Sequence, residues 1–130
     1  MNTEIPVDVL KRCLLNIDEP VGKRTHAAFL LRTRAVSKET PEDDRTEAIS
    51  SLSLALVNKK DGALMRHEIA YILGQIQSPM ALPVLSEVLR DRAADAVVRH
   101  ECAEALGAIG DLAAIAELQD FVEAAAPEVR

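Results

Sequence analysis

The chain has almost no aromatic residues. Phe29, Tyr71 and Phe121, with no Trp, make up 2% of its 130 residues. Proteins built from β-sandwiches or barrels depend on aromatic and β-branched side chains, so this scarcity argues against an all-β fold. Leu and Ala dominate the chain instead, which favours helices. With 48% hydrophobic and 28% charged residues, the composition is that of one ordinary globular domain.

Several other features are missing. No apolar run approaches the roughly 18–20 residues that cross a bilayer, and the first ten residues lack the basic and then apolar layout of a signal peptide. The net charge is −6 without a basic cluster, so nucleic-acid binding through counterion release is not expected. An acidic chain is better suited to a basic partner. The sequence also lacks a Gly-rich phosphate loop, a nucleophile elbow and the His-Glu-x-x-His motif.

The chain has two cysteines, Cys13 and Cys102. They have no Cys-x-x-Cys spacing, and Cys102 falls in an apolar helical pattern. We therefore expect buried or half-buried free thiols rather than a disulfide, and hence a cytoplasmic protein.

An internal repeat dominates the rest of the sequence. Residues 66–76 and 99–109 lie 33 positions apart and are identical at seven of eleven positions. Apolar residues in both segments recur at i, i+3, i+4 and i+7, which is the pattern of an amphipathic helix. A weaker copy begins at Arg24, 42 residues before Arg66. The additional residues fall in a polar stretch with Pro41, so we expect a loop insertion over 34–45.

These observations predict an all-α fold, an α-solenoid of short HEAT-like helical hairpins. Ankyrin repeats share the period, but their Thr-Pro-Leu-His signature is absent here. We expect a single domain over 1–130, with a leading helix near Pro6–Leu15. The predicted repeat units are 6–33 with 46–58, 62–90 and 95–125. Residues 126–130 resemble the entry to a further helix, which predicts either a cut chain or a partner that covers this end.

A His-Glu dipeptide occurs twice at the same position of the repeat, as His67-Glu68 and His100-Glu101. Neighbouring helices pack about 8–10 Å apart, so both histidines should face one shared space. Imidazole and carboxylate are ligands for iron, manganese or zinc, and two imidazoles with one carboxylate and open positions form the facial triad of non-haem iron(II) sites. The sequence thus predicts a metal site made of His67, His100 and either Glu101 or Glu68.

The surroundings of the dipeptides support this prediction. Glu104 lies one helical turn after His100 and adds a carboxylate, while Tyr71 holds the equivalent place after His67. Small residues on the same helices are expected to leave room above the site; they are Ala70, Gly74, Ala103 and Gly107. The structural alternative is that such residues serve helix stacking and capping. Arg66 and Arg99 are expected to order either the repeat stack or the carboxylates. His26 belongs to the copy that lacks the dipeptide and is not expected to be a ligand.

The segments Leu64–Gln75 and Val98–Asp111 together resemble deoxyhypusine hydroxylases, and the resemblance extends over nearly the whole chain. It implies a HEAT-repeat monooxygenase that uses dioxygen and a non-haem di-iron centre. The implied substrate is the deoxyhypusine residue of translation initiation factor five-A. By motif, His67, His100 and Glu101 would bind one iron. Glu68 would be catalytic beside the substrate amine, and Glu68 and Glu104 would bind the cationic substrate.

The chain departs from that family in one respect. The family carries four His-Glu dipeptides in two similar halves, and this chain has two. We therefore interpret it as the amino-terminal half, inactive alone unless a second half or a second copy completes the centre. Two alternatives stay open. One is a non-enzymatic HEAT-like scaffold, including a phycobilisome-lyase-like protein; the other is an iron-binding lobe without turnover.

Overall fold

The fold is known from a computed structural model that describes residues 4–110, 112, 114–116, 118–120 and 122. All regular elements in this part of the chain are helical, so the predicted all-α solenoid is confirmed. They are α1 (Val7–Leu15), α2 (Val21–Val36), α3 (Glu42–Val57), α4 (Ala63–Ile76), the short 3-10 helix η1 (Pro79–Ala81), α5 (Leu82–Arg90) and α6 (Ala96–Ile109). The described residues between 112 and 122 are helical too. The end of the last predicted unit and residues 126–130 lie outside the described residues.

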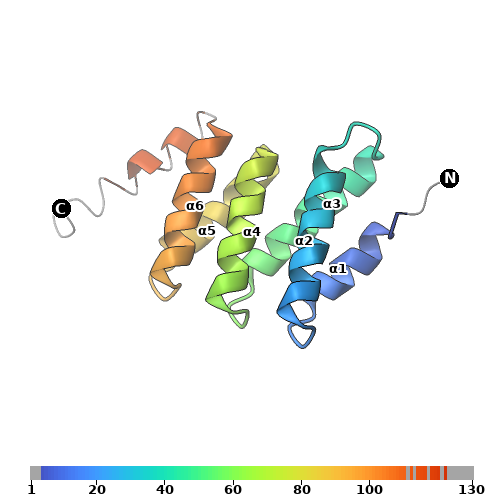
Figure 1. Cartoon of the computed structure of the whole chain (residues 1–130). Coiled ribbons are helices and arrows are strands. Elements are labelled where there is room, and N and C mark those ends of the chain that lie inside the picture. The colour runs from blue at the N-terminus through green and yellow to red at the C-terminus, as the bar shows by residue number, and fades with distance from the viewer. Residues whose placement is uncertain (1–3, 111, 113, 117, 121, 123–130) are drawn as a thin grey trace.

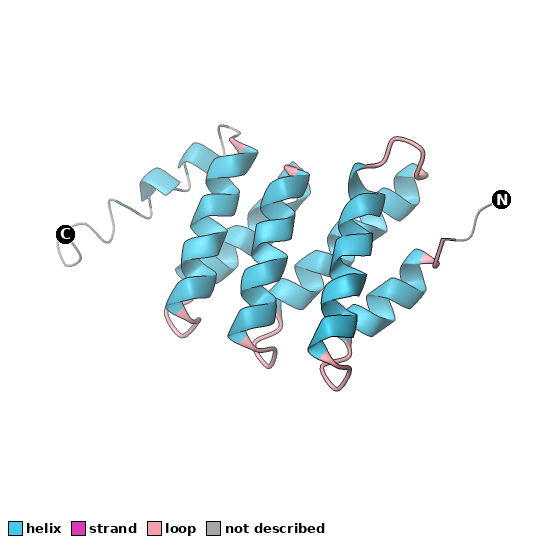
Figure 2. Ribbon diagram, viewed as in Figure 1, coloured by secondary structure: helices cyan, strands magenta, loops and turns pink. Residues whose placement is uncertain are grey.

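The helices form two layers. Helices α2, α4 and α6 stand side by side in one layer, and α1, α3 and α5 cross behind them in the other (Figure 1). Short loops join successive helices (Figure 2), so each unit is a helical hairpin that stacks on the next one. No helix in the described ranges combines the length and apolarity needed to span a membrane.

The expected loop insertion over 34–45 is wrong in its bounds. Helix α2 continues to Val36 and α3 already begins at Glu42, so the connection between them covers 37–41 alone. The residues beyond the 33-residue period lengthen both helices instead. The polar stretch forms the exposed first turn of α3, where Glu42, Asp43 and Asp44 are favourable because a helix N-terminus carries partial positive charge.

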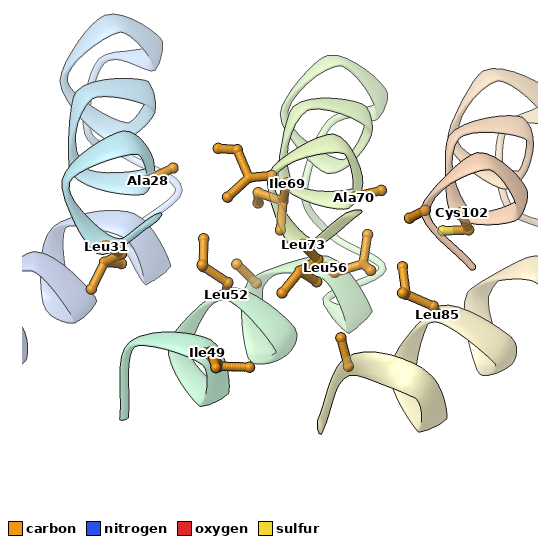
Figure 3. Packing of buried hydrophobic residues seen from close by; sticks show 14 of the residues in the cluster. Ala28, Leu31, Ile49, Leu52, Leu56, Ile69, Ala70, Leu73, Leu85 and Cys102 are labelled. Carbon is orange, nitrogen blue, oxygen red and sulfur yellow. The ribbon is translucent and has the colours of Figure 1, made fainter. Parts of the chain in front are cut away.

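Apolar side chains from both layers fill the space between them (Figure 3). Leu, Ile, Val and Ala supply nearly all of this core, which explains how the chain folds with so few aromatics. The largest fully buried side chains are Leu14, Leu31, Leu52, Leu56, Ile69, Ile72, Leu73, Leu85, Leu89, Leu106, Val88 and Val98.

Three arginines at one repeat position join the layers. Arg24, Arg66 and Arg99 each donate a hydrogen bond from Nε to a backbone carbonyl ten residues earlier, at 2.8–2.9 Å. The acceptors are Leu14, Leu56 and Leu89, in the last turns of α1, α3 and α5. The last carbonyls of a helix lack partners within it, so each arginine satisfies one of them. Arg66 and Arg99, expected to order the repeat stack or the carboxylates, here join the two helices of their own hairpins.

Candidate metal centre

The two His-Glu dipeptides lie in the second turns of α4 and α6, which are neighbours in one layer (Figure 1). Helix α6 begins at a side-chain cap, where Asp95 accepts a hydrogen bond from the backbone N–H of Val97 at 2.9 Å. The matching 14-residue lengths of α4 and α6 put the dipeptides in register. Helices α4 and α6 make the most extensive helix contact in the described structure. Only His67 faces that interface, so the expectation that both histidines face one shared space is wrong for His100.

His67 and Glu101 meet across this interface. His67 Nε2 and Glu101 Oε1 lie 2.9 Å apart, close enough for an ion pair between the two helices when the imidazole is protonated. Glu101 is 8% exposed, whereas His67 is half-buried. A buried carboxylate is costly unless a donor or a cation satisfies it. The imidazole of His67 does so here, and a metal ion could replace its proton.

His100 and Glu68 are placed differently. His100 Nε2 lies 3.2 Å from Glu104 Oε1 of the same helix, and the His100 side chain is 71% exposed. Glu68 is half-buried and forms no ion pair with the described residues. The predicted ligands thus form two separate pairs. Within the described ranges, no three His, Cys, Asp or Glu side chains are grouped closely enough to hold a metal ion.

The small residues near the dipeptides do not all leave room. Ala70 is fully buried, and a Cβ added at Gly74 would lie 3.0 Å from both Cα and Cβ of Ala105 on α6. The expectation of open space is therefore wrong at these two positions. Gly107, in contrast, has nothing within 4 Å of such a Cβ. Gly74 instead permits the close approach of α4 and α6 that brings Glu101 to His67.

A chain of polar side chains that the sequence did not predict lies beside the dipeptides. Arg32 of α2 donates to Gln75 of α4, and Gln75 donates to the hydroxyl oxygen of Tyr71. Tyr71 and Gln75 follow His67 at i+4 and i+8, so the helical period alone places them on its face. Nothing in the sequence pairs Gln75 with Arg32, which lies 43 residues away.

The cysteines are not part of the site. Both are free thiols, as predicted. Burial raises the pKa of the Cys102 thiol to about 12, although the nearby Arg66 lowers it. A thiolate is the form that binds metal, so Cys102 stays inert. His26 is exposed on α2, consistent with its exclusion from the ligands.

The types of donor, though not their arrangement in the described structure, suit a non-haem iron. Imidazole nitrogen and carboxylate oxygen already converge in the pair of His67 and Glu101, and His100 precedes Glu101 in the chain. Two histidines and one carboxylate suit iron(II), because imidazole and carboxylate both bind this ion well.

Comparison with known proteins agrees with the motif. The HEAT repeats family matches residues 49–130. Deoxyhypusine hydroxylase-B of Oryza sativa subsp. japonica is 41% identical over 125 residues, which cover 96% of this chain and 38% of that protein. Deoxyhypusine hydroxylase of Chaetomium globosum is 38% identical over 128 residues, covering 98% of this chain and 36% of the relative.

A solved structure is similar as well. Human deoxyhypusine hydroxylase in complex with glycerol superposes with a TM-score of 0.74 at 38% identity, over 88% of this chain and 36% of that one. The predicted resemblance to deoxyhypusine hydroxylases is thereby confirmed. The chain spans well under half the length of each of these relatives.

Proposed function

Because this chain belongs to the HEAT-repeat family and is similar to deoxyhypusine hydroxylases, we propose that it is the amino-terminal lobe of such an enzyme. The whole enzyme would be an iron-dependent monooxygenase of the cytoplasm. Its substrate would be the deoxyhypusine residue of translation initiation factor five-A. The contact of His67 with Glu101 between α4 and α6 is the observation that carries this proposal.

One iron would be held by His67, His100 and Glu101. His100 would leave Glu104 to join the set, which costs little because both side chains are largely exposed. The ligands of the second iron would come from a second half or from a second copy of this chain. When bound, the di-iron centre supplies the activation of dioxygen, the co-substrate.

The remaining carboxylates would bind the substrate. Deoxyhypusine carries amines that are cationic at neutral pH, so acidic side chains near the metal attract and orient it. Glu68 directly follows His67 and has no ion-pair partner among the described residues, so its carboxylate is free to hold a substrate ammonium group. Glu104, once released by His100, would add a second negative charge.

Anaerobic titration of the purified chain with Fe(II) tests the metal site. We expect the variants His67→Ala and His100→Ala to bind iron at least tenfold more weakly than the parent, because each removes one ligand. His26→Ala is the matched control: it removes an exposed histidine at the corresponding part of α2 and should bind as the parent does. If the first two variants bind iron as tightly as the parent, the metal assignment is wrong.

The lobe assignment needs a second measurement. Sedimentation analysis of the chain, with and without Fe(II), gives its mass, and elemental analysis gives the iron content of each species. A dimer that holds two irons supports a centre rebuilt from two copies, and a monomer with one iron supports a lobe that needs a different half. A monomer that hydroxylates deoxyhypusine by itself would contradict both.

A further inference from the structure

The polar chain on α2 and α4 ends in a hydroxyl group next to the candidate metal centre. Arg32 Nη1 donates to Gln75 Oε1 at 2.6 Å, and Gln75 Nε2 donates to Tyr71 Oη at 3.0 Å. The guanidinium of Arg32 lies 4.9 Å from the centroid of the Phe29 ring, which adds a cation–π contact. Phe29, on the same helix α2, therefore fixes the guanidinium of Arg32 in the position from which it bonds Gln75 of α4.

This chain of donors has a fixed direction. A guanidinium has no acceptor, so Gln75 must turn its amide oxygen toward Arg32 and its NH₂ group toward Tyr71. The oxygen of Tyr71 then accepts a hydrogen bond from Gln75, and its own proton is not used in that bond. Tyr71 is 45% exposed and makes no other hydrogen bond with the described residues, so its O–H remains available to an acceptor from outside.

The position of Tyr71 indicates where that acceptor lies. Residues four apart on a helix are neighbours on one face, with Cβ atoms about 5–6 Å apart. Tyr71 is therefore adjacent to His67, which contacts Glu101. The corresponding residue on α6 is Glu104, an acceptor, so the site has an O–H donor on the α4 side and a carboxylate on the α6 side.

We infer that Tyr71 donates a hydrogen bond to a small acceptor ligand bound at the metal held by His67, His100 and Glu101, and that Gln75 and Arg32 position it for this purpose. The inference rests on the proposed function, in which dioxygen is the small ligand. The substrate amine is the poorer partner for this O–H, because a protonated amine can only donate and the carboxylates of Glu68 and Glu104 suit it better.

Cobalt(II) and azide test the inference without turnover. Cobalt(II) occupies sites of this kind and has a visible spectrum, and azide is a small anionic acceptor whose binding changes that spectrum. We expect Tyr71→Phe to bind cobalt(II) as the parent does but azide roughly ten- to hundredfold more weakly, the loss of one hydrogen bond to a charged ligand. Equal azide affinities of the parent and Tyr71→Phe would overturn the inference.

A second variant tests the direction of the donors. In Gln75→Glu the carboxylate can only accept hydrogen bonds, so it should retain the bond from Arg32 and accept a second one from the hydroxyl group of Tyr71. Azide binding should then weaken as in Tyr71→Phe, although the tyrosine is present. Thr33→Glu adds the same charge at the equivalent repeat position of α2 and controls for repulsion of the anion. If both glutamate variants weaken azide binding equally, the relay through Gln75 is refuted.

The two proposals fail in different ways. A parent chain that binds no cobalt(II) would overturn the metal site and, with it, the role of Tyr71. If the parent chain binds cobalt(II) through His67 but azide binds equally well to the parent and to Tyr71→Phe, only the role of Tyr71 is overturned.

Discussion

Gly74 of α4 packs directly against Ala105 of α6, so closely that a Cβ on Gly74 would lie 3.0 Å from Cα and Cβ of Ala105. Two helix turns before Gly74, the same interface holds the contact between His67 and Glu101, whose Nε2 and Oε1 atoms lie 2.9 Å apart. Because Cα of Ala105 is a backbone atom, a larger residue at 74 must move one of the two helices. The width of the α4–α6 interface and the candidate metal centre are therefore coupled.

Gly74→Ala should destabilise the fold by about 1–2 kcal/mol. The added methyl group overpacks the interface, and this loss exceeds the stability gained by replacing a glycine inside a helix. It should also weaken Fe(II) binding, because α6 moves away from His67. Gly107→Ala is the matched control at the equivalent repeat position, where the added methyl meets nothing within 4 Å. That control should gain about 0.5–1 kcal/mol. Urea unfolding measures both changes, and equal effects of the two would refute the role given to Gly74.

Arg24 and Asp61 form a buried ion pair that joins the first hairpin to the loop before α4. Their side chains are 3% and 4% exposed, and the contact is bidentate. The hydrogen bond with Asp61 raises the pKa of Arg24 above its already high value, so the arginine stays charged. Asp61→Ala would leave that charge buried and should cost about 3–5 kcal/mol of unfolding free energy.

The pair of Glu19 and Lys23, four residues apart, is the control for this prediction, with side chains 29% and 59% exposed. Glu19→Ala should cost much less stability than Asp61→Ala, because water screens a pair that it can reach. Thermal unfolding of both variants decides the matter. A loss of stability in Asp61→Ala no larger than that in Glu19→Ala would contradict the assignment.

The buried thiol of Cys102 makes stability fall at high pH. Its pKa of about 12 in the folded chain exceeds the ordinary value of 9.0. Between these values the unfolded chain releases the proton while the folded chain keeps it, so the free energy of unfolding decreases as pH rises. From pH 8 to pH 10 the parent should lose about 1 kcal/mol more than Cys102→Ala. Denaturant unfolding of the two proteins at both pH values measures this difference, and parallel losses would disprove the shift.

Glu101→Gln distinguishes an effect on metal binding from an effect on the stability of the fold. The amide keeps the shape of the side chain and its oxygen can still lie against His67, so stability should change by less than about 1 kcal/mol. Iron(II) affinity should fall at least tenfold, because a neutral amide is a poorer ligand than a carboxylate. Glu104→Gln alters the carboxylate beside His100 instead and should retain most of the affinity. If Glu104→Gln loses more iron(II) affinity than Glu101→Gln, the metal binds on the outer face of α6 instead.

Most of the fold could be predicted because repeats and helix periodicity are local properties. The leading helix ends at Leu15 as expected, and α4, α5 and α6 fall in the predicted units. The interval 34–45 could not be assigned correctly, because its polar residues are compatible with either a loop or an exposed helix turn. The acidic first turn of α3 at Glu42 decides for the helix.

The repeat, the apolar faces of the helices and the register of the two His-Glu dipeptides can all be inferred from the sequence, since a 33-residue period and a 3.6-residue helix relate positions along one chain. Whether Glu68 or Glu101 joins the histidines stayed open. The contact of Glu101 with His67 results from tertiary packing, because it depends on how closely α4 and α6 approach at Gly74. The contact of Arg32 with Gln75 was likewise decided by the packing of α2 on α4, which brings together side chains that no local pattern connects.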